Sequence, residues 1–217
     1  MRFLSRLVDL VMVNVITLVY MIPVITAGGA LTAMNHVLLH LVREDETYVF
    51  QMFRKSFRIN FKQGIIEGLL VLAAGGIAAV DLWALHGSDS PAATMMMIIV
   101  TIIAILIFVT CVYMFALQSR YENTVGGTVA NALKLAIGNL PRSAGMAVIW
   151  LIWIVFLVYL HNAAALAILV FGLSLPGYLC AMLYSRIFEK LEEGLEPEEE
   201  EPRTELFEED LGPEQHH

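Results

Sequence analysis

Five polar side chains interrupt the apolar stretches of this sequence and could carry chemistry: Asn14, Asn35, His36, His40 and Glu67. His36 and His40 are four residues apart, so a helix places both imidazoles on one face. Together with a carboxylate such as Glu67, they could bind a metal ion or relay a proton. The glutamate of an HExxH motif is missing, however. We therefore expect no metal and no cofactor, and we expect these side chains to make hydrogen bonds between helices, with metal or proton chemistry as the alternative.

No other group of residues supplies an active site. The sequence has no Ser/His/Asp arrangement, no phosphate-binding loop and no nucleotide-binding motif. Cys111 and Cys180 both fall inside apolar runs, where thiols usually behave as small hydrophobic side chains. The basic residues are too few to indicate nucleic-acid binding. We predict a protein that is not an enzyme and has no nucleic-acid partner.

The apolar content indicates a membrane protein. The 217 residues are 58% hydrophobic, against about 45–50% in soluble domains, and the mean hydropathy is +0.71. A helix that spans a bilayer needs roughly 20 apolar residues. The apolar runs predict an all-α, polytopic helical membrane protein with spans at about residues 7–25, 27–42, 64–85, 92–119, 143–161 and 163–185. The first run resembles a secretory signal, but Asp9 and Asn14 interrupt it and more spans follow, so we expect it to be retained.

The short second run decides the topology. As a helix, residues 27–42 rise about 24 Å, less than the ~30 Å hydrocarbon core, although local thinning can absorb the difference. If this helix lay on the surface, there would be five spans, and Arg2 and Arg6 would face outward. If it crosses, six spans form three hairpins with external turns, and the basic residues of the body lie in the cytoplasm. The positive-inside rule favours six spans, with both chain ends cytoplasmic; five spans are the alternative.

Amphipathic cytoplasmic connectors should join the hairpins. In the first, the phenylalanines recur at intervals of three or four, which places them on one helical stripe beside basic residues: Phe50, Phe53, Phe57 and Phe61, with Arg54, Lys55, Arg58 and Lys62. The basic residues are expected to contact lipid headgroups; alternatively, the helix packs on the bundle with its charges in water. In the second connector, a stripe of Val129, Leu133, Ile137 and Leu140 predicts protein packing.

Four further residues mark expected features of the spans. Glu67 lies about one turn inside the third span and should reach water, Arg58 or Lys62. The pair Pro176-Gly177 should break the last span, either as a packing kink or as a transporter-type break. Pro141 suits the first turn of the fifth span, where its missing N–H costs nothing.

The sequence divides into a membrane domain, residues 1–190, and an acidic tail, residues 191–217. From Glu189 onward there are thirteen acidic and two basic side chains, a formal charge of −11, whereas residues 1–188 carry +3. Such a segment cannot bury enough apolar surface to fold alone, so we predict a disordered tail. Leu206-Phe207 as a small docking motif is the alternative.

Two stretches resemble the YesL-like membrane proteins, domain of unknown function 624: "PVITAGGALTAMNHVLLHLVRED", with the Phe-rich segment after it, and "LQSRYENTVGGTVANALKLAIGNLPRS". The matching residues are Pro23, Val24, Thr26, Gly28, Leu41, Arg43 and Glu44; Phe53, Phe57, Asn60 and Phe61; and Arg120, Tyr121, Thr124, Asn131, Ala132, Asn139, Leu140 and Pro141. Gly29 stands where the family pattern has proline. The similarity covers roughly residues 1–190, and the acidic tail lies outside it.

This resemblance implies an integral protein of the cell membrane of a Gram-positive bacterium. Members of the family are commonly encoded near carbohydrate ABC importers, sugar-sensing systems and glycoside hydrolases, and no activity is established for them. The resemblance therefore implies an accessory role in carbohydrate uptake or its sensing, with an ABC permease or a sensor kinase as partner and the lipid bilayer as surroundings. A small secondary transporter or channel, with a polar site among the spans, is the alternative.

Overall fold

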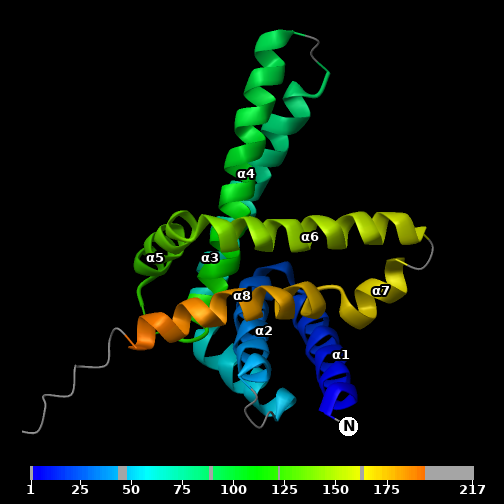
Figure 1. Ribbon diagram of the computed structural model, residues 1–217, viewed down its shortest axis with the longest axis vertical. Coiled ribbons are helices and arrows are strands. Elements are labelled where there is room, and N and C mark those ends of the chain that lie inside the picture. Colours follow the sequence, from blue (N-terminus) through cyan, green and yellow to red (C-terminus); the bar gives the residue numbers. More distant parts are fainter. Residues whose placement is uncertain (1, 44–47, 88–89, 122, 162–163, 194–217) are drawn as a thin grey trace, which may run out of the picture. The chain divides into compact units, whose positions relative to one another are not determined.

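The computed structural model describes residues 2–43, 48–87, 90–121, 123–161 and 164–193, and none of these is in a strand. The all-α prediction is therefore confirmed. The elements are α1 (Arg2–Met21), the 3-10 turn η1 (Val24–Thr26), α2 (Ala27–Val42), α3 (Val49–Leu85), α4 (Pro91–Gln118), α5 (Val125–Gly138), α6 (Leu140–Leu160), α7 (Ala164–Phe171) and α8 (Ser174–Glu193) (Figure 1). The chain divides into two units between Ser185 and Arg186, within α8.

Five helices are long and apolar enough to cross a bilayer: Leu4–Met21, Val24–Val42, Val49–Leu85, Pro91–Gln118 and Leu140–Leu160. The bent pair Ala164–Phe171 and Ser174–Lys190, at 46°, counts as a sixth if it is one broken span. A multi-pass membrane protein is thus confirmed, with five or six spans. The short second span qualifies because η1 lengthens it to nineteen residues.

Glycines allow α2 and α3 to approach closely. A Cβ atom built on Gly28 would overlap the carbonyl oxygen of Gly64 and lie 2.8 Å from the backbone nitrogen of Gly68. A Cβ on Gly64 would lie 2.6 Å from the Cα of Gly29. Backbone therefore lies on backbone at this contact, as in the GxxxG interfaces of membrane helices. Only glycine fits at Gly28 and Gly64.

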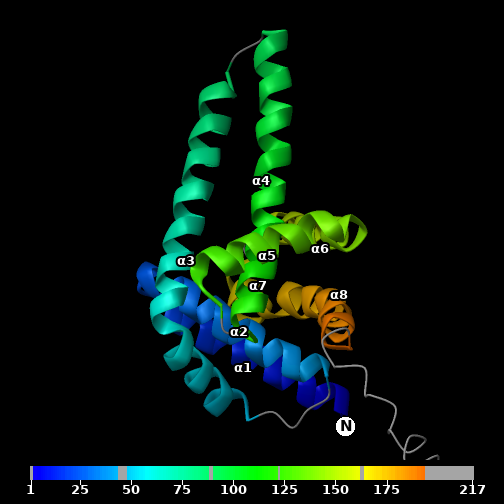
Figure 2. The same cartoon turned by 90° about the vertical axis from the view of Figure 1, so that its left-hand side faces the viewer.

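This contact staggers the first two hairpins. Since Gly28 lies beside Gly64, the turn between α1 and α2 is next to the middle of α3. From Gly64 to Leu85, α3 rises about 31 Å, roughly one bilayer thickness. Figures 1 and 2 show α3 and α4 running on together beyond α1 and α2. Three equivalent hairpins would require these two turns to lie at the same level along α3. The turns lie at different levels.

The first connector is not a separate surface helix, because α3 is continuous from Val49 to Leu85. Within it, Phe53 is buried, and the rings of Phe53 and Phe57 meet Tyr20 of α1 edge to face, at centroid distances of 5.3 and 4.7 Å. Part of the phenylalanine stripe therefore packs on the bundle, whereas Phe50 and Phe61 remain exposed.

The second connector forms α5, which begins where the Thr124 side chain accepts a hydrogen bond from the Gly127 N–H at 3.2 Å. Its buried residues are Thr128, Ala132 and Ala136, and it packs against α4. The predicted packing stripe is confirmed only in part: Val129 is half-buried and, with Leu133, lines a pocket with residues of α3 and α4, whereas Ile137 and Leu140 are exposed. The side chains of α5 that are fully buried are small, which lets α4 and α5 approach closely.

We predict that Gly64→Ala destabilises the protein by about 1–3 kcal/mol, because the added methyl group meets backbone that cannot move aside. Gly76→Ala is the matched control: it lies on the same helix, and a Cβ there meets nothing within 4 Å. Thermal unfolding in detergent measures both variants. Equal midpoints for Gly64→Ala and Gly76→Ala would contradict the close contact.

Candidate functional site

A polar pocket of about 270 Å³ lies where α2, α3 and the end of α4 meet. It gathers residues that the sequence placed in three separate groups: His36, Lys55 with Asn60, and Arg120 with Tyr121. The full lining is His36, Lys55, Ser56, Ile59, Asn60, Gln118, Ser119, Arg120 and Tyr121. We call this the polar pocket.

The back wall of the polar pocket is a chain of side-chain hydrogen bonds. Gln118 Nε2 donates to Asn60 Oδ1 at 3.0 Å, and Thr128 Oγ1 donates to Gln118 Oε1 at 3.3 Å. Asn60 Nδ2 in turn donates to the Ser56 carbonyl at 3.1 Å. These bonds fix the orientation of both amides, and each amide oxygen accepts one hydrogen bond within the wall.

His36 joins α2 to the end of α4. Its Nδ1 lies 3.1 Å from the carbonyl oxygen of Ser119. Because a carbonyl only accepts, Nδ1 carries the proton, and Nε2 holds the lone pair of the neutral ring. The His40 ring lies edge to face against His36, at a centroid distance of 4.8 Å. The predicted shared face of the two histidines is confirmed.

Ser56, Asn60, Gln63 and Glu67 follow one another on α3 at intervals of four, three and four. This spacing puts them on one stripe of the helix. Gln63 Nε2 donates to the Asn123 carbonyl at 2.6 Å, so the stripe faces the end of α4. Sequence analysis singled out Asn60 and Glu67 but missed Ser56, Gln63 and Gln118; the polar periodicity within α3 was the signal.

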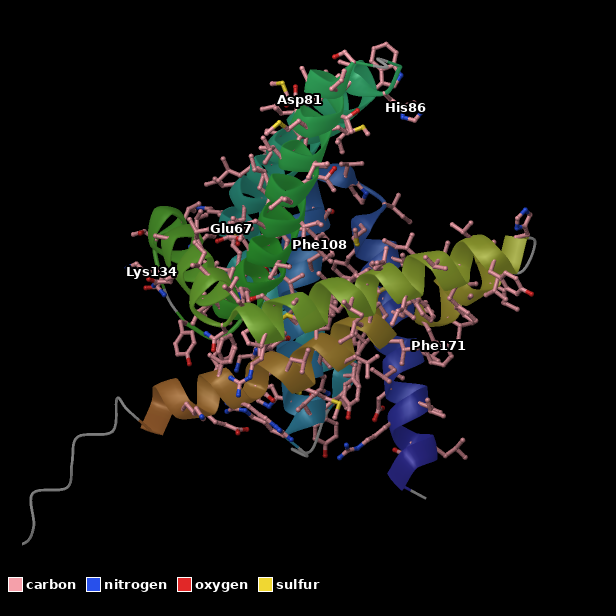
Figure 3. The ribbon with its side chains drawn as sticks, turned by 45° about the horizontal axis from the view of Figure 1, so that its top comes forward. Glu67, Asp81, His86, Phe108, Lys134 and Phe171 are labelled. Atoms are coloured by element: carbon pink, nitrogen blue, oxygen red, sulfur yellow. The ribbon has the colours of Figure 1, made fainter. Side chains whose placement is uncertain are left out.

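Glu67 ends this stripe and is fully buried, at 0% exposed. Neither of its carboxylate oxygens has a hydrogen-bond partner among the described residues. The expectation that it reaches water, Arg58 or Lys62 is wrong, because it faces into the bundle. Figure 3 shows that Asp81 and His86 lie far along the hairpin from it. A buried carboxylate without a partner opposes folding and, inside a span, is a candidate for function.

No group of three His, Cys, Asp or Glu residues in the described part of the chain is arranged to hold a metal ion. His36 and His40 are adjacent, but Glu67 does not complete a site with them. The side chains of His36, His40 and Glu67 are therefore not arranged as a metal site.

Asn14 bridges the break between α7 and α8. Its Nδ2 donates to the carbonyls of Ile168 and Leu169 at 2.9 and 2.8 Å. Its Oδ1 accepts from the N–H groups of Leu173 and Ser174 at 2.8 and 3.2 Å. One fully buried amide thus makes hydrogen bonds to backbone groups on both sides of the break, although the Ile168 carbonyl also accepts from the Gly172 N–H at 2.9 Å.

The break itself lies at Gly172-Leu173, so the expected break at Pro176-Gly177 is wrong. Pro176 is the third residue of α8, where no intrahelical N–H bond is lost. The Gly172 carbonyl accepts from Trp153 Nε1 at 2.9 Å. The backbone groups at the break are therefore occupied by the protein itself.

Asn35 also makes an interhelical bond: its Oδ1 accepts from the Tyr184 hydroxyl at 2.9 Å. The remaining predicted residues are scattered. Arg54, Arg58, Lys62 and Asn131 are exposed, Arg43 and Asn139 are half-buried, and Glu44 lies outside the described residues. Pro141 occupies the first turn of α6, as predicted. Beyond Glu193, the predicted tail also lies outside the described residues.

A second cavity, of about 520 Å³, lies among the spans and is apolar. Its lining includes Met34, Val71, Ala79, Ile107 and Phe108, with Asn35 as a polar exception. Asn35 is already bonded to Tyr184, whereas Nε1 of Trp150, which also lines the cavity, has no hydrogen-bond partner among the described residues. The cavity therefore offers few polar groups to a polar solute. We call it the apolar groove.

These helices and their buried polar contacts define a multi-pass helical membrane protein. Residues 10–82 match the family described as "Protein of unknown function, DUF624", so this third of the chain is similar to that family. The resemblance expected from the sequence is thus confirmed over this segment. The motif residues from Arg120 to Pro141 lie outside the match, and their assignment stays a prediction. No curated protein and no solved structure matches the chain.

We predict that Glu67→Met stabilises the protein by about 1–3 kcal/mol, because it removes a buried polar group that has no partner. Asp81→Asn is the control, since it removes an exposed carboxylate from the same helix and should change stability by less than about 0.5 kcal/mol. Thermal unfolding in detergent gives both values. A lower midpoint for Glu67→Met than for the wild type would mean that Glu67 has a stabilising partner.

Proposed function

We propose that this protein is a non-enzymatic accessory protein of the cell membrane that assembles with a carbohydrate ABC permease or with the sensor kinase that controls it. The apolar groove is the observation on which the proposal depends. A path for a sugar needs polar groups that replace water around its hydroxyls. An apolar groove between helices suits an apolar side chain or a helix of another membrane protein instead.

The wall of the groove that α3 provides is built of small residues. Gly75, Ala78 and Ala79 line it, and a Cβ on Gly75 would meet nothing within 4 Å. At Gly28 and Gly64, backbone of this protein fills the space that a side chain would take. At Gly75 no atom of the protein fills that space. Small residues let membrane helices approach closely, so this face supports the docking of a partner's helix.

The bonds at the α7–α8 break also favour an accessory protein over a transporter. Broken helices serve transport when their free backbone groups bind the substrate or an ion. Here Asn14 and Trp153 occupy those groups. The break is therefore explained as a packing feature.

The alternative is a small secondary transporter, and Glu67 is the observation that favours it. A buried carboxylate inside a span is typical of proton-coupled transport. This alternative requires the apolar groove to open to water in another conformation. Sugar accumulation by proteoliposomes that contain only this protein, abolished in Glu67→Gln, would support it over the accessory role.

The resemblance to the YesL-like family supports a carbohydrate partner and a Gram-positive host. We expect affinity purification from host membranes after mild crosslinking to enrich a carbohydrate permease or a sensor kinase. Filling the groove with Gly75→Leu and Ala79→Leu should reduce this enrichment about tenfold. Val80→Leu, at an exposed position of α3 that does not line the groove, is the control. Equal enrichment in all variants, or no enriched partner, would refute docking at the groove.

We also propose that the basic end of the bundle faces the cytoplasm. In a background with Cys111 and Cys180 replaced by serine, His86→Cys should react with an impermeant thiol reagent in intact cells. Lys134→Cys should react only after permeabilisation. Figure 3 shows these two residues near opposite ends of α4. The reverse pattern of labelling would overturn the orientation.

A further inference from the structure

A third cavity, of about 350 Å³, lies between α3, α4 and α5. Its lining includes Leu70 and Ala74 of α3, residues of α4 from Ile103 to Met114, and Leu133 of α5. Leu70 and Ile103 are about half exposed, so the cavity is open to the surroundings of these helices. For helices that span a membrane these surroundings are lipid, and we call this cavity the lateral groove.

The lateral groove has almost no hydrogen-bonding capacity to offer an occupant. Thr110 and Cys111 are the polar side chains in its lining. The Thr110 hydroxyl already donates to the Leu106 carbonyl at 2.7 Å, and a thiol is a weak donor. An occupant of the groove must therefore be apolar along its whole length.

The length of the lateral groove matches one leaflet of a bilayer. Between Ile103 and Met114, α4 rises ~16 Å. The hydrocarbon core of a bilayer is ~30 Å thick, so each leaflet contributes ~15 Å of acyl chain. A single acyl chain lying along α4 would thus run the length of the groove.

The walls of the lateral groove favour a flexible chain over a helix. The apolar groove presents small residues of α3, which let another helix approach closely. In the lateral groove, α3 and α4 present large side chains such as Leu70, Ile103 and Leu106, which hold a helix backbone away. A hydrocarbon chain carries no side chains and can follow the space between them.

One end of the lateral groove lies at the end of α3 that carries the basic residues. The hydrogen bond between Asn60 and Gln118 fixes the relative height of α3 and α4. Met114, four residues before Gln118, is therefore about level with Gly64, four residues after Asn60 in the antiparallel helix. Lys62 lies about half a turn beyond Gly64.

The exposed charges near this end of the lateral groove are both positive. From Asn60 to Val80 of α3, and throughout α4 and α5, the exposed charged side chains are those of Lys62 and Lys134. Lys134 directly follows Leu133, which lines the groove. Glu67 is fully buried and does not line it. Two lysines at the end of an apolar groove suit an anionic headgroup.

We propose that the lateral groove binds one anionic phospholipid, with an acyl chain along α4 and its headgroup beside Lys62 and Lys134. In a bilayer the chain gains little from burial alone, because lipid is as apolar as the groove. Packing along the walls places the chain, and the two lysines select the charge of the headgroup. The site does not depend on which partner occupies the apolar groove.

The test titrates the full-length protein, delipidated in mild detergent, with phosphatidylglycerol or phosphatidylcholine and counts bound lipids by native mass spectrometry. The first phosphatidylglycerol should bind about tenfold more tightly than the first phosphatidylcholine. Replacing both Lys62→Gln and Lys134→Gln should abolish this preference. Lys190→Gln removes an exposed lysine of α8, which does not line the groove, and should retain it.

A second pair of variants tests whether the acyl chain lies in the lateral groove. Ala74→Phe fills the groove and should weaken binding of the first phosphatidylglycerol about tenfold, because the chain loses its contacts with the walls. Ala73→Phe adds the same ring at the next residue, which is exposed and does not line the groove, and should leave binding unchanged. Equal binding by both variants, or equal affinities of the wild type for the two lipids, would overturn the proposal.

A third measurement leaves the walls of α3 and α4 without added bulk, so it remains decisive if Ala74→Phe does not fold. With Cys111 and Cys180 replaced by serine, Leu133→Cys in phosphatidylcholine nanodiscs is treated with a lipid-soluble maleimide. Added phosphatidylglycerol should slow this reaction about tenfold when the site is nearly saturated. Ile137→Cys, exposed on the same helix outside the groove, should react at an unchanged rate. Equal slowing at both positions would contradict a lipid seated in the groove.

Discussion

The contact between backbones at Gly28, Gly64 and Gly68 sets the arrangement of the helices around it. It holds α2 along the first half of α3 and fixes how far α3 extends beyond the first hairpin. The polar pocket depends on the same contact, because His36 on α2 meets Lys55 and Asn60 on α3 only if these helices lie side by side. In a bilayer, where lipid is as apolar as leucine, such close packing and interhelical hydrogen bonds replace the hydrophobic effect as the source of specificity.

Polar groups in the apolar body are used sparingly, and most have defined partners. Asn14 satisfies an interrupted helix, Asn35 meets Tyr184, and Asn60 meets Gln118. Glu67 departs from this pattern, since its oxygens have no partner among the described residues. Its presence costs stability, and the structure gives it no packing role that a methionine could not fill. That contrast makes Glu67 the strongest argument for the transporter alternative.

The sequence predicted the helical class and a multi-pass membrane protein, because long apolar runs and helix length leave few other solutions in a bilayer. It also predicted the shared face of His36 and His40. The predictions from the sequence were wrong where contacts between helices determine the structure. In α5 the buried residues are the small Thr128, Ala132 and Ala136, whereas Ile137 of the apolar stripe is exposed. The first connector merges into α3 because nothing in its sequence ends a helix. The pocket could not be foreseen, since its residues converge only through the glycine contact.

The bridge made by Asn14 has a consequence for biogenesis. The amide and its carbonyl partners are 154 and 155 residues apart, so the ribosome completes the first helix long before the segment it must receive. Until then, the Asn14 amide lacks its hydrogen bonds to α7 and α8, and the face of α1 that carries Asn14 is not yet covered by these helices. Insertion and assembly are therefore separate events here, and the membrane-embedded body closes only when its last helices reach its first.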